Sequence, residues 1–303
     1  LGFVLYLNNR IMDRKTFIKS VSLLSISSQM MSLNSLFNLV TDHKIEKPLP
    51  IIFLGHGSPM NAIEKNEFTD GWSHLAEHLE NVKAILCVSA HWKTKGTYIT
   101  GMKLPKTIHD FGGFPQVLYD VQYPAPGDPE LAMEIQQHFK DHILIDHDWG
   151  LDHGCWSVLM HIFPKANVPV LQLSLDYRKD PEYHYQLAKK LTELRRKGVL
   201  IVGSGNMVHN LRALNWTEGS GGYDWAVEAN EKFKELINKQ DHVALTQYSK
   251  LGKAVQNAVP TPEHYLPLLY VLGMRDKNET AYFFNDKTMM GSISMTSVAF
   301  GLN

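Results

Sequence analysis

The sequence has few cysteines, almost no net charge and no long apolar run, and each shortage excludes a class of protein. The two cysteines in 303 residues, Cys87 and Cys155, are too few for the disulfide framework of a small secreted domain. Lys and Arg number 30 against 31 Asp and Glu, so charge gives no reason to expect binding to nucleic acid or an anionic membrane. No apolar run approaches the roughly 20 residues that span a bilayer, so we expect no membrane span.

Residues 1–47 differ from the rest, and we expect them to form a leader or extension outside the catalytic domain. The segment from Met12 to Lys19 is basic and is followed by a short apolar stretch, which is the outline of a bacterial export signal. The pair Arg14-Lys15 is close to a twin-arginine signal but has lysine in the second place, and no clear cleavage site follows. We expect a cytoplasmic protein with a dispensable N-terminus; export to the periplasm through a twin-arginine-like leader is the alternative.

From Pro48 onward, short aliphatic runs alternate with amphipathic segments. The runs are typical of strands that are buried on both faces, and they cover residues 51–54, 84–88, 168–175 and 199–202. Helices are predicted at residues 68–82, 129–139, 181–197 and 225–239. This alternation predicts a single α/β domain over residues 48–303, with a central, mostly parallel or mixed sheet flanked by helices. The Gly- and Pro-rich stretch 101–129 is expected to be a long loop, and such loops often contribute to a site.

Histidine is the residue present in excess, with 15 copies. Three of them, His56, His91 and His209, follow predicted strands, and ligands of open α/β sheets bind beyond the carboxyl ends of the strands. A single histidine in such a place is more often a hydrogen-bonded loop residue, but three at equivalent places favour a common site. Neutral imidazole binds zinc and iron, and a catalytic metal typically has three protein ligands and an open position. Glycines beside these histidines (Gly55, Gly57, Gly203 and Gly205) would allow the backbone to approach closely.

Three other histidines, His264, His153 and His109, are weaker candidates when each is taken alone. A competing pattern is His74-Leu75-Ala76-Glu77-His78, which matches the H-x-x-E-H motif of some zinc proteases. Both of its histidines lie off the apolar stripe of the predicted helix, and short motifs arise easily in a chain rich in histidine. We therefore interpret His74 and His78 as surface residues.

Six segments of the chain, taken together and in order, resemble the 4,5-DOPA extradiol dioxygenase family. This family is the bacterial and plant branch of the class III extradiol ring-cleaving enzymes. The segments are Leu54–Met60, Ser89–Trp92, Thr107–Pro115, Gly150–Gly154, Gly203–Asn210 and Pro260–Tyr270. The resemblance covers about residue 48 to the C-terminus and leaves residues 1–47 outside.

The resemblance implies a fold, an activity and a role for each candidate histidine. It implies a single α/β domain that opens the ring of a catechol such as DOPA with O2, so the expected partners are a small aromatic diol and O2. His56, His91 and His264 correspond to metal ligands. His209 corresponds either to a fourth ligand or to the acid–base histidine, His153 to a catalytic histidine that hydrogen-bonds substrate or O2, and His109 to a substrate-binding residue of the pocket.

One divalent metal, Zn2+ or Fe2+, is expected, and its identity stays open in the sequence. Oxygen activation usually uses Fe(II) on two histidines and a carboxylate, whereas the third ligand here resembles histidine. An all-histidine site also suits zinc, which has no redox chemistry. Two alternatives follow: a zinc-dependent hydrolase on the same scaffold, and a metal-binding protein without catalysis.

Overall fold

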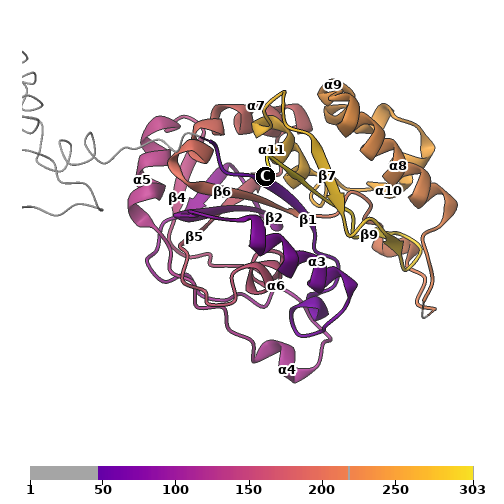
Figure 1. Cartoon of the computed structure of the whole chain (residues 1–303), viewed down its shortest axis with the longest axis horizontal. Helices are drawn as coiled ribbons and strands as arrows, with labels where there is room; N and C mark the ends of the chain where they lie inside the picture. Colours follow the sequence, from indigo (N-terminus) through magenta and orange to yellow (C-terminus); the bar gives the residue numbers. More distant parts are fainter. Residues whose placement is uncertain (1–46, 218, 303) are drawn as a thin grey trace, which may run out of the picture. The chain divides into compact units, whose positions relative to one another are not determined.

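The computed structural model describes residues 47–217 and 219–302 (Figure 1). The predicted leader or extension at residues 1–47 lies, apart from Lys47, outside the described residues. Eight strands form one sheet in the order β4-β3-β5-β2-β6-β1-β10-β7. Their bounds are β1 Ile51–Gly55, β2 Ala84–Thr94, β3 Thr97–Thr100, β4 Ile143–Asp146, β5 Val170–Asp176, β6 Val199–Gly205, β7 Ala281–Phe284 and β10 Ser297–Phe300. A separate pair is formed by β8 (Thr288–Met289) and β9 (Ile293–Ser294).

The middle of the sheet is parallel and its edges are mixed. Strands β5, β2, β6 and β1 run in one direction, with Ile51 of β1 opposite Ile201 of β6. β10 is antiparallel to both β1 and β7, and β3 is antiparallel to β5 but parallel to β4. The predicted α/β domain with a mostly parallel or mixed sheet is confirmed. Because the four central strands are parallel, their carboxyl ends meet at one edge.

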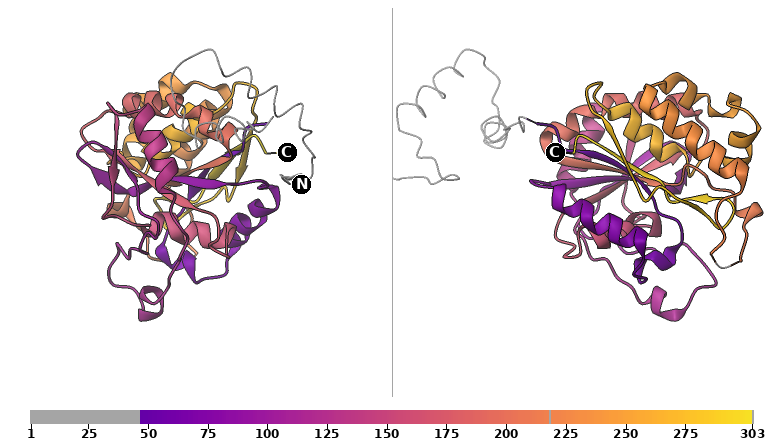
Figure 2. Two further views of the ribbon diagram at one scale, coloured as in Figure 1. Left: turned by 90° about the vertical axis from the view of Figure 1, so that its left-hand side faces the viewer. Right: turned by 45° about the vertical axis from the view of Figure 1, so that its right-hand side comes forward.

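Helices cover both faces of this sheet (Figure 2, right). The α-helices are α3 Glu67–Leu75, α4 Gln116–Tyr119, α5 Pro129–His138, α6 His153–Ile162, α7 Pro181–Lys190, α8 Asp224–Lys239, α9 His242–Thr246, α10 Lys253–Ala258 and α11 Leu266–Met274. The 3-10 helices are η1 Pro59–Ala62, η2 Ala76–His78, η3 Thr192–Lys197, η4 Leu211–Ala213 and η5 Tyr248–Lys250.

Strand β1 shows why the central strands appear in the sequence as continuous apolar runs. Ile51 and Phe53 belong to one core cluster, together with residues of α5, α7, α8, α10 and α11. Ile52 and Leu54 belong to a second cluster, together with residues of α3 and α6. All four side chains are fully buried, since successive residues of a strand point to opposite faces and both faces are covered.

Three predicted boundaries were wrong. β2 continues to Thr94 because its pairing with β5 resumes at Lys93 after a register shift beyond Val88, so His91 lies within the strand and not after it. The helix predicted for residues 68–82 ends as α3 at Leu75 and passes into η2. The helix predicted for 181–197 breaks at Leu191 into α7 and η3; the three-residue repeat of a 3-10 helix places the buried Leu191 and Leu194 on one side.

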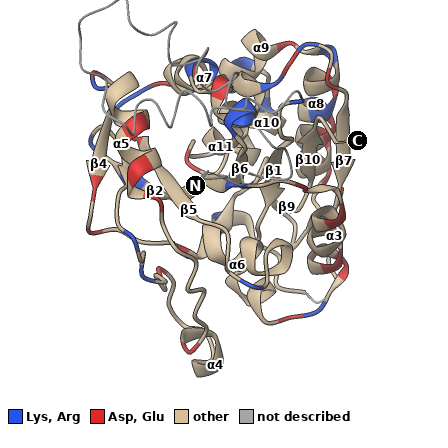
Figure 3. Cartoon of the chain, turned by 60° about the vertical axis from the view of Figure 1, so that its left-hand side comes forward, with Lys and Arg blue, Asp and Glu red and all other residues tan. Residues whose placement is uncertain are grey.

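Charged residues lie mainly on the helices and loops, and the strands of the sheet carry few (Figure 3). Blue and red segments are interspersed along the ribbon in this view. Within the described part of the chain, no helix is both long enough and apolar enough to cross a membrane.

Candidate metal centre

Three histidines from distant parts of the chain meet at the carboxyl edge of the sheet. His56 follows β1 directly, His91 lies near the end of β2, and His264 precedes α11. Each offers one ring nitrogen to a group in which all the nitrogens lie within 4.8 Å of one another. His56 Nε2 and His91 Nε2 lie 3.1 Å apart.

The protonation of the His56 ring follows from its hydrogen bonds. Its Nδ1 lies 3.0 Å from Oγ of Ser204, in β6. That hydroxyl donates its proton to the carbonyl oxygen of Gly154, so it must accept from Nδ1–H of His56. The proton of the neutral ring is therefore on Nδ1, and Nε2 carries a lone pair directed toward His91.

The ring nitrogens of this group are arranged as a bound cation would require. His91 Nδ1 lies 3.3 Å from Oδ2 of Asp110. A carboxylate accepts protons and repels a lone pair, so Nδ1 of His91 is the protonated nitrogen as well. Two Nε2 lone pairs then face each other at 3.1 Å, which is repulsive unless a cation lies between them. His264 is the third member of the group, and its side chain is buried. The residues fit one divalent ion.

Burial keeps these imidazoles neutral, as metal ligands must be. Burial, with a smaller contribution from the neighbouring histidines, lowers the pKa of His56 and of His264 well below the usual value. Burial also lowers the pKa of His91 to about 3, although the nearby Asp110 acts in the opposite direction. Asp110 itself is ionised: burial would raise its pKa, but the hydrogen bonds and charge of His153 together with His91 hold it at about 2.

Two glycines allow the elements around the cluster to approach one another. A Cβ atom on Gly205 would lie 2.1 Å from the carbonyl oxygen of His264, which is the close backbone approach predicted for this glycine. A Cβ on Gly154 would lie 2.6 Å from Oγ of Ser89 and 2.9 Å from Cδ2 of His91. Gly154 therefore lets the first turn of α6 pack directly against His91.

The structure places His153 inside the cluster. It is the first residue of α6, and its ring centroid lies 3.9 Å from that of His91. Both its backbone nitrogen and its Nδ1 contact Oδ1 of Asp110, at 2.8 and 3.0 Å. Asp152 caps the N-terminus of this helix, because its side chain accepts a hydrogen bond from the backbone N–H of Cys155.

His209 also lies in the cluster, but in a different arrangement. Its ring is stacked on that of His264, with centroids 3.5 Å apart and an interplanar angle of 9°. The lone pairs of imidazole nitrogens lie in the ring plane, so two parallel rings direct them side by side and not toward one point. This geometry favours the predicted acid–base role over the predicted fourth-ligand role. Burial lowers the pKa of His209 to about 4.

His109 lies beside this cluster and is bound to its own loop. Its Nε2 donates to the carbonyl oxygen of Val121 at 2.9 Å. Its ring belongs to a group of aromatic side chains, which we call the aromatic wall and which consists of His109, Phe111, Phe114, Tyr119 and Trp156. Phe111 connects the wall to the histidines, with its ring centroid 5.5 Å from that of His153. The segment 101–129 was predicted to be one long loop; it contains the short helix α4 (Gln116–Tyr119) but is otherwise irregular, and it brings Phe111 beside His153.

Two polar residues that contact the ring nitrogens of the histidines, Asp110 and Ser204, were not predicted from the sequence. Both lie inside segments that carry the family resemblance, and Asp110 directly follows a candidate histidine. Such residues could be predicted as carboxylates or hydroxyls next to a candidate ligand, because a metal-binding histidine usually donates its second ring N–H to a group of this kind.

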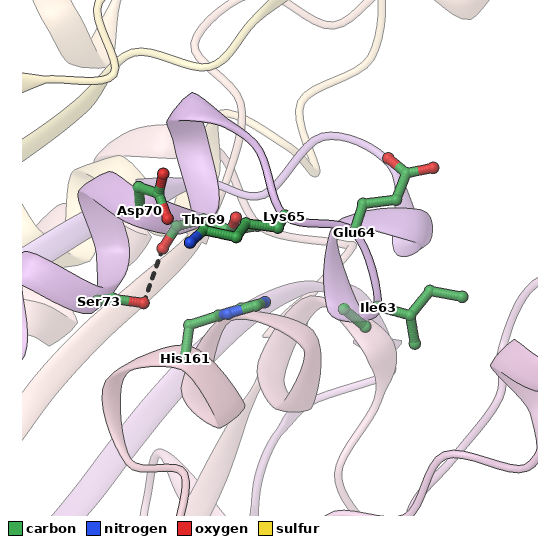
Figure 4. Close-up of a pocket in the computed structure, with 8 residues that line it drawn as sticks. Ile63, Glu64, Lys65, Thr69, Asp70, Ser73 and His161 are labelled. Carbon is green, nitrogen blue, oxygen red and sulfur yellow. Dashed lines mark hydrogen bonds between the residues drawn. The ribbon is translucent and has the colours of Figure 1, made fainter.

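Histidines away from the cluster make ordinary hydrogen bonds. His74 is exposed, and its Nδ1 contacts the carbonyl oxygen of Asp70 at 2.8 Å; α3 ends before His78, which is also exposed. His161 faces a surface pocket between α3 and α6 (Figure 4). Its Nε2 donates to the carbonyl oxygen of Asn61 at 2.7 Å. The pocket is lined by Ala62, Ile63, Glu64, Lys65, Thr69, Asp70, Ser73 and His161.

Comparisons with known proteins show the family of this chain. A 4,5-DOPA dioxygenase extradiol from Escherichia coli K12 is 46% identical over 259 residues, which cover 84% of this chain and 95% of the relative. One from Beta vulgaris is 34% identical over 259 residues, which cover 82% and 95%. A crystal structure of an uncharacterized E. coli K12 protein superposes with a TM-score of 0.73 at 41% identity, covering 83% of this chain and 99% of that one. Residues 50–301 match the family described as the catalytic LigB subunit of aromatic ring-opening dioxygenase, and the chain belongs to this family of dioxygenases.

Proposed function

We propose that the protein opens the ring of a catechol, such as DOPA, with O2, and that it does so with one divalent metal held by His56, His91 and His264. The observation that carries the proposal is the pair of Nε2 lone pairs that face each other at 3.1 Å beside a third buried imidazole. The substrate class follows from the relatives, whose names give DOPA as the compound acted on.

The metal is Zn2+ or Fe2+, since the donor set of neutral imidazoles suits both. When bound, such a cation stabilises the anionic form of a catechol and, if it is iron, supplies the electron exchange that oxygen chemistry needs. The protein contributes three neutral ligands whose orientation is set before the metal arrives.

His153 and His209 are the groups proposed to move protons. Nδ1 of His153 is held by Asp110, so Nε2 is the atom that can take or return a proton. His209 is neutral at pH 7 because burial lowers its pKa, so it is ready to act as a base toward a catechol hydroxyl. The ring of His153 lies against His91, and the ring of His209 lies against His264.

The aromatic wall is proposed to orient the substrate ring. Phe111 lies edge-on to His153 and connects to Phe114 and Tyr119, so it forms an apolar surface next to a proton-transfer group. His109, predicted to bind substrate, uses Nε2 to hold the loop, and we propose that it acts on the substrate through the ring that it contributes to the wall.

The test is anaerobic loading of metal-free protein with Fe(II) or Zn(II), followed by DOPA or another catechol with 18O2. The expected result is oxygen uptake, a yellow product, and both 18O atoms in that product. The variant His56→Ala should abolish uptake, whereas His74→Ala, which alters an exposed histidine outside the cluster, should leave it unchanged.

Two other results would replace the proposal. Ester or amide hydrolysis by the Zn(II) form, without oxygen uptake from any catechol, would support the zinc hydrolase. Tight metal binding without either activity would leave a metal-binding protein.

A further inference from the structure

The carboxylate of Asp110 lies between a metal-binding histidine and a catalytic one and contacts both. Oδ1 accepts from the backbone N–H of His153 at 2.8 Å and from Nδ1 of the same residue at 3.0 Å. Oδ2 lies 3.3 Å from Nδ1 of His91. One side chain, carried by the loop 101–129, thus faces three nitrogens that belong to β2 and α6.

The two oxygens are not interchangeable. The backbone N–H of His153 is permanently a donor, so the oxygen beside it must remain an acceptor. The Nδ1 of His153 shares that oxygen and is therefore also a donor. The second oxygen is left for His91, whose Nδ1 has no other side-chain acceptor near it among the contacts of the described residues.

We propose that Asp110 is a positioning residue that sets the tautomers of His91 and His153 together, with the proton on Nδ1 of each ring. His91 then presents an Nε2 lone pair for a metal, and His153 presents Nε2 for proton exchange. The tautomers follow from the hydrogen-bond geometry alone; their consequence for metal binding and catalysis rests on the proposed function.

An asparagine at this place separates positioning from simple packing, because it has the same shape but only one acceptor oxygen. That oxygen must stay beside His153, whose backbone N–H cannot become an acceptor. The amide N–H2 then faces Nδ1 of His91, and the ring must carry its proton on Nε2 to accept from it. Asp110→Asn is therefore expected to turn the metal-binding nitrogen of His91 into a donor.

The first measurement is the tautomeric state of His91 in metal-free protein labelled with 15N-histidine, with signals assigned from His91→Gln and His153→Gln. Long-range 1H–15N spectra show which ring nitrogen carries the proton. We expect Nδ1–H in the wild-type protein and Nε2–H in Asp110→Asn. The matched control is Asp120→Asn, which alters an exposed carboxylate of the same loop that binds only Gln116 among the described contacts.

The second measurement is Zn2+ affinity, by competition with a chromophoric chelator. Loss of a group that orients a metal-binding histidine typically lowers affinity 10–100-fold, so we expect a loss of about that size in Asp110→Asn and none in Asp120→Asn. Thermal unfolding of the metal-free variants shows whether the loss comes from the fold.

Several results would overturn the proposal. An Nε2–H tautomer of His91 in the wild-type protein would contradict it directly, and this result does not depend on any variant folding. An unchanged tautomer or unchanged Zn2+ affinity in a folded Asp110→Asn variant would do the same. If tautomer and affinity change as expected while the wild-type protein opens no catechol, the positioning role stands and the proposed function fails.

Discussion

The ring of His209 lies flat on the ring of His264, with the centroids 3.5 Å apart and the planes at 9°. Parallel rings cannot both direct their in-plane lone pairs at one ion, so we expect the two histidines to have different roles. His264 belongs to the group that could hold a metal, whereas His209 does not.

This stacking predicts that His209→Ala retains most of its metal and loses turnover. General acid–base catalysis typically contributes a factor of about 100 to 10,000, so we expect a loss of that order in kcat. Metal analysis after gel filtration, alongside oxygen uptake with DOPA, measures both quantities. His264→Ala is the comparison and should lose the metal. If His209→Ala lost the metal to the same extent, His209 would be a ligand.

Ser204→Ala should weaken metal binding although Ser204 does not touch the metal. The variant removes the acceptor of Nδ1–H of His56, so the ring is free to rotate or to move its proton to Nε2. Zn2+ affinity, measured by chelator competition, should fall about tenfold or more. Ser73→Ala is the control and should leave the Zn2+ affinity unchanged. It removes an exposed hydroxyl that donates to the carbonyl oxygen of Thr69 within α3. Equal affinities in the two variants would argue against the tautomer assigned to His56.

Gly205→Ala should destabilise the whole domain. The added Cβ would meet the carbonyl oxygen of His264 at 2.1 Å, and relieving this overlap requires β6 and the segment before α11 to move apart. Overpacking of this kind costs about 1–3 kcal/mol or more in the free energy of unfolding, which urea titration measures. Gly112→Ala is the matched control, because its Cβ would meet nothing within 4 Å. A stability equal to that of the control would contradict the close approach.

Below neutral pH, the stability of the metal-free protein should depend on His184. This residue is fully buried, its Nδ1 contacts the hydroxyl of Tyr270 at 3.1 Å, and burial lowers its pKa to about 4. Between its unfolded pKa of about 6.5 and this value, the unfolded chain binds a proton that the native protein does not. The free energy of unfolding should therefore fall as the pH decreases through that window, by at most about 1.4 kcal/mol per pH unit for this one group.

The measurement is urea unfolding of wild-type protein and His184→Gln at several pH values between 4.5 and 7. Burial also lowers the pKa values of the histidines of the candidate metal centre, so both proteins should lose stability on acidification. The informative quantity is the difference, and the slope should be shallower in the variant. If the free energy of unfolding had the same pH dependence in both proteins, His184 would not contribute to the loss of stability on acidification.

The arrangement of the core was predictable from the sequence, whereas several element boundaries were not. Strands such as β1 and β6 are continuous aliphatic runs because both faces are covered, and that pattern is local. The extension of β2 to include His91 depends on renewed pairing with β5, which is a tertiary contact and leaves no local signal. The break of the helix at Leu191 depends on which leucines reach the core.

In the candidate site, too, features with a local sequence pattern were predictable and features set by tertiary contacts were not. His56 and His91 follow from the strand pattern, but His264 was weak until the family resemblance was considered, because the sequence near it is rich in proline and contains no predicted strand. The role of Asp110 depends on α6 bringing His153 beside β2, and α6 was not predicted. The stacking of His209 on His264 joins two loops that no periodicity relates.

Strand β6 lies between β1 and β2 in the sheet, so the proposed ligands His56 and His91 reach across a strand that follows both of them in the chain by more than 100 residues. His264 comes later still, next to the buried helix α11. The ring nitrogens of this group are therefore brought together only when nearly the whole domain has assembled. A metal bound here is linked to global folding, since it stabilises the native state in proportion to the logarithm of its concentration over its dissociation constant. Metal content thus serves as a report on the integrity of the entire chain from β1 to α11.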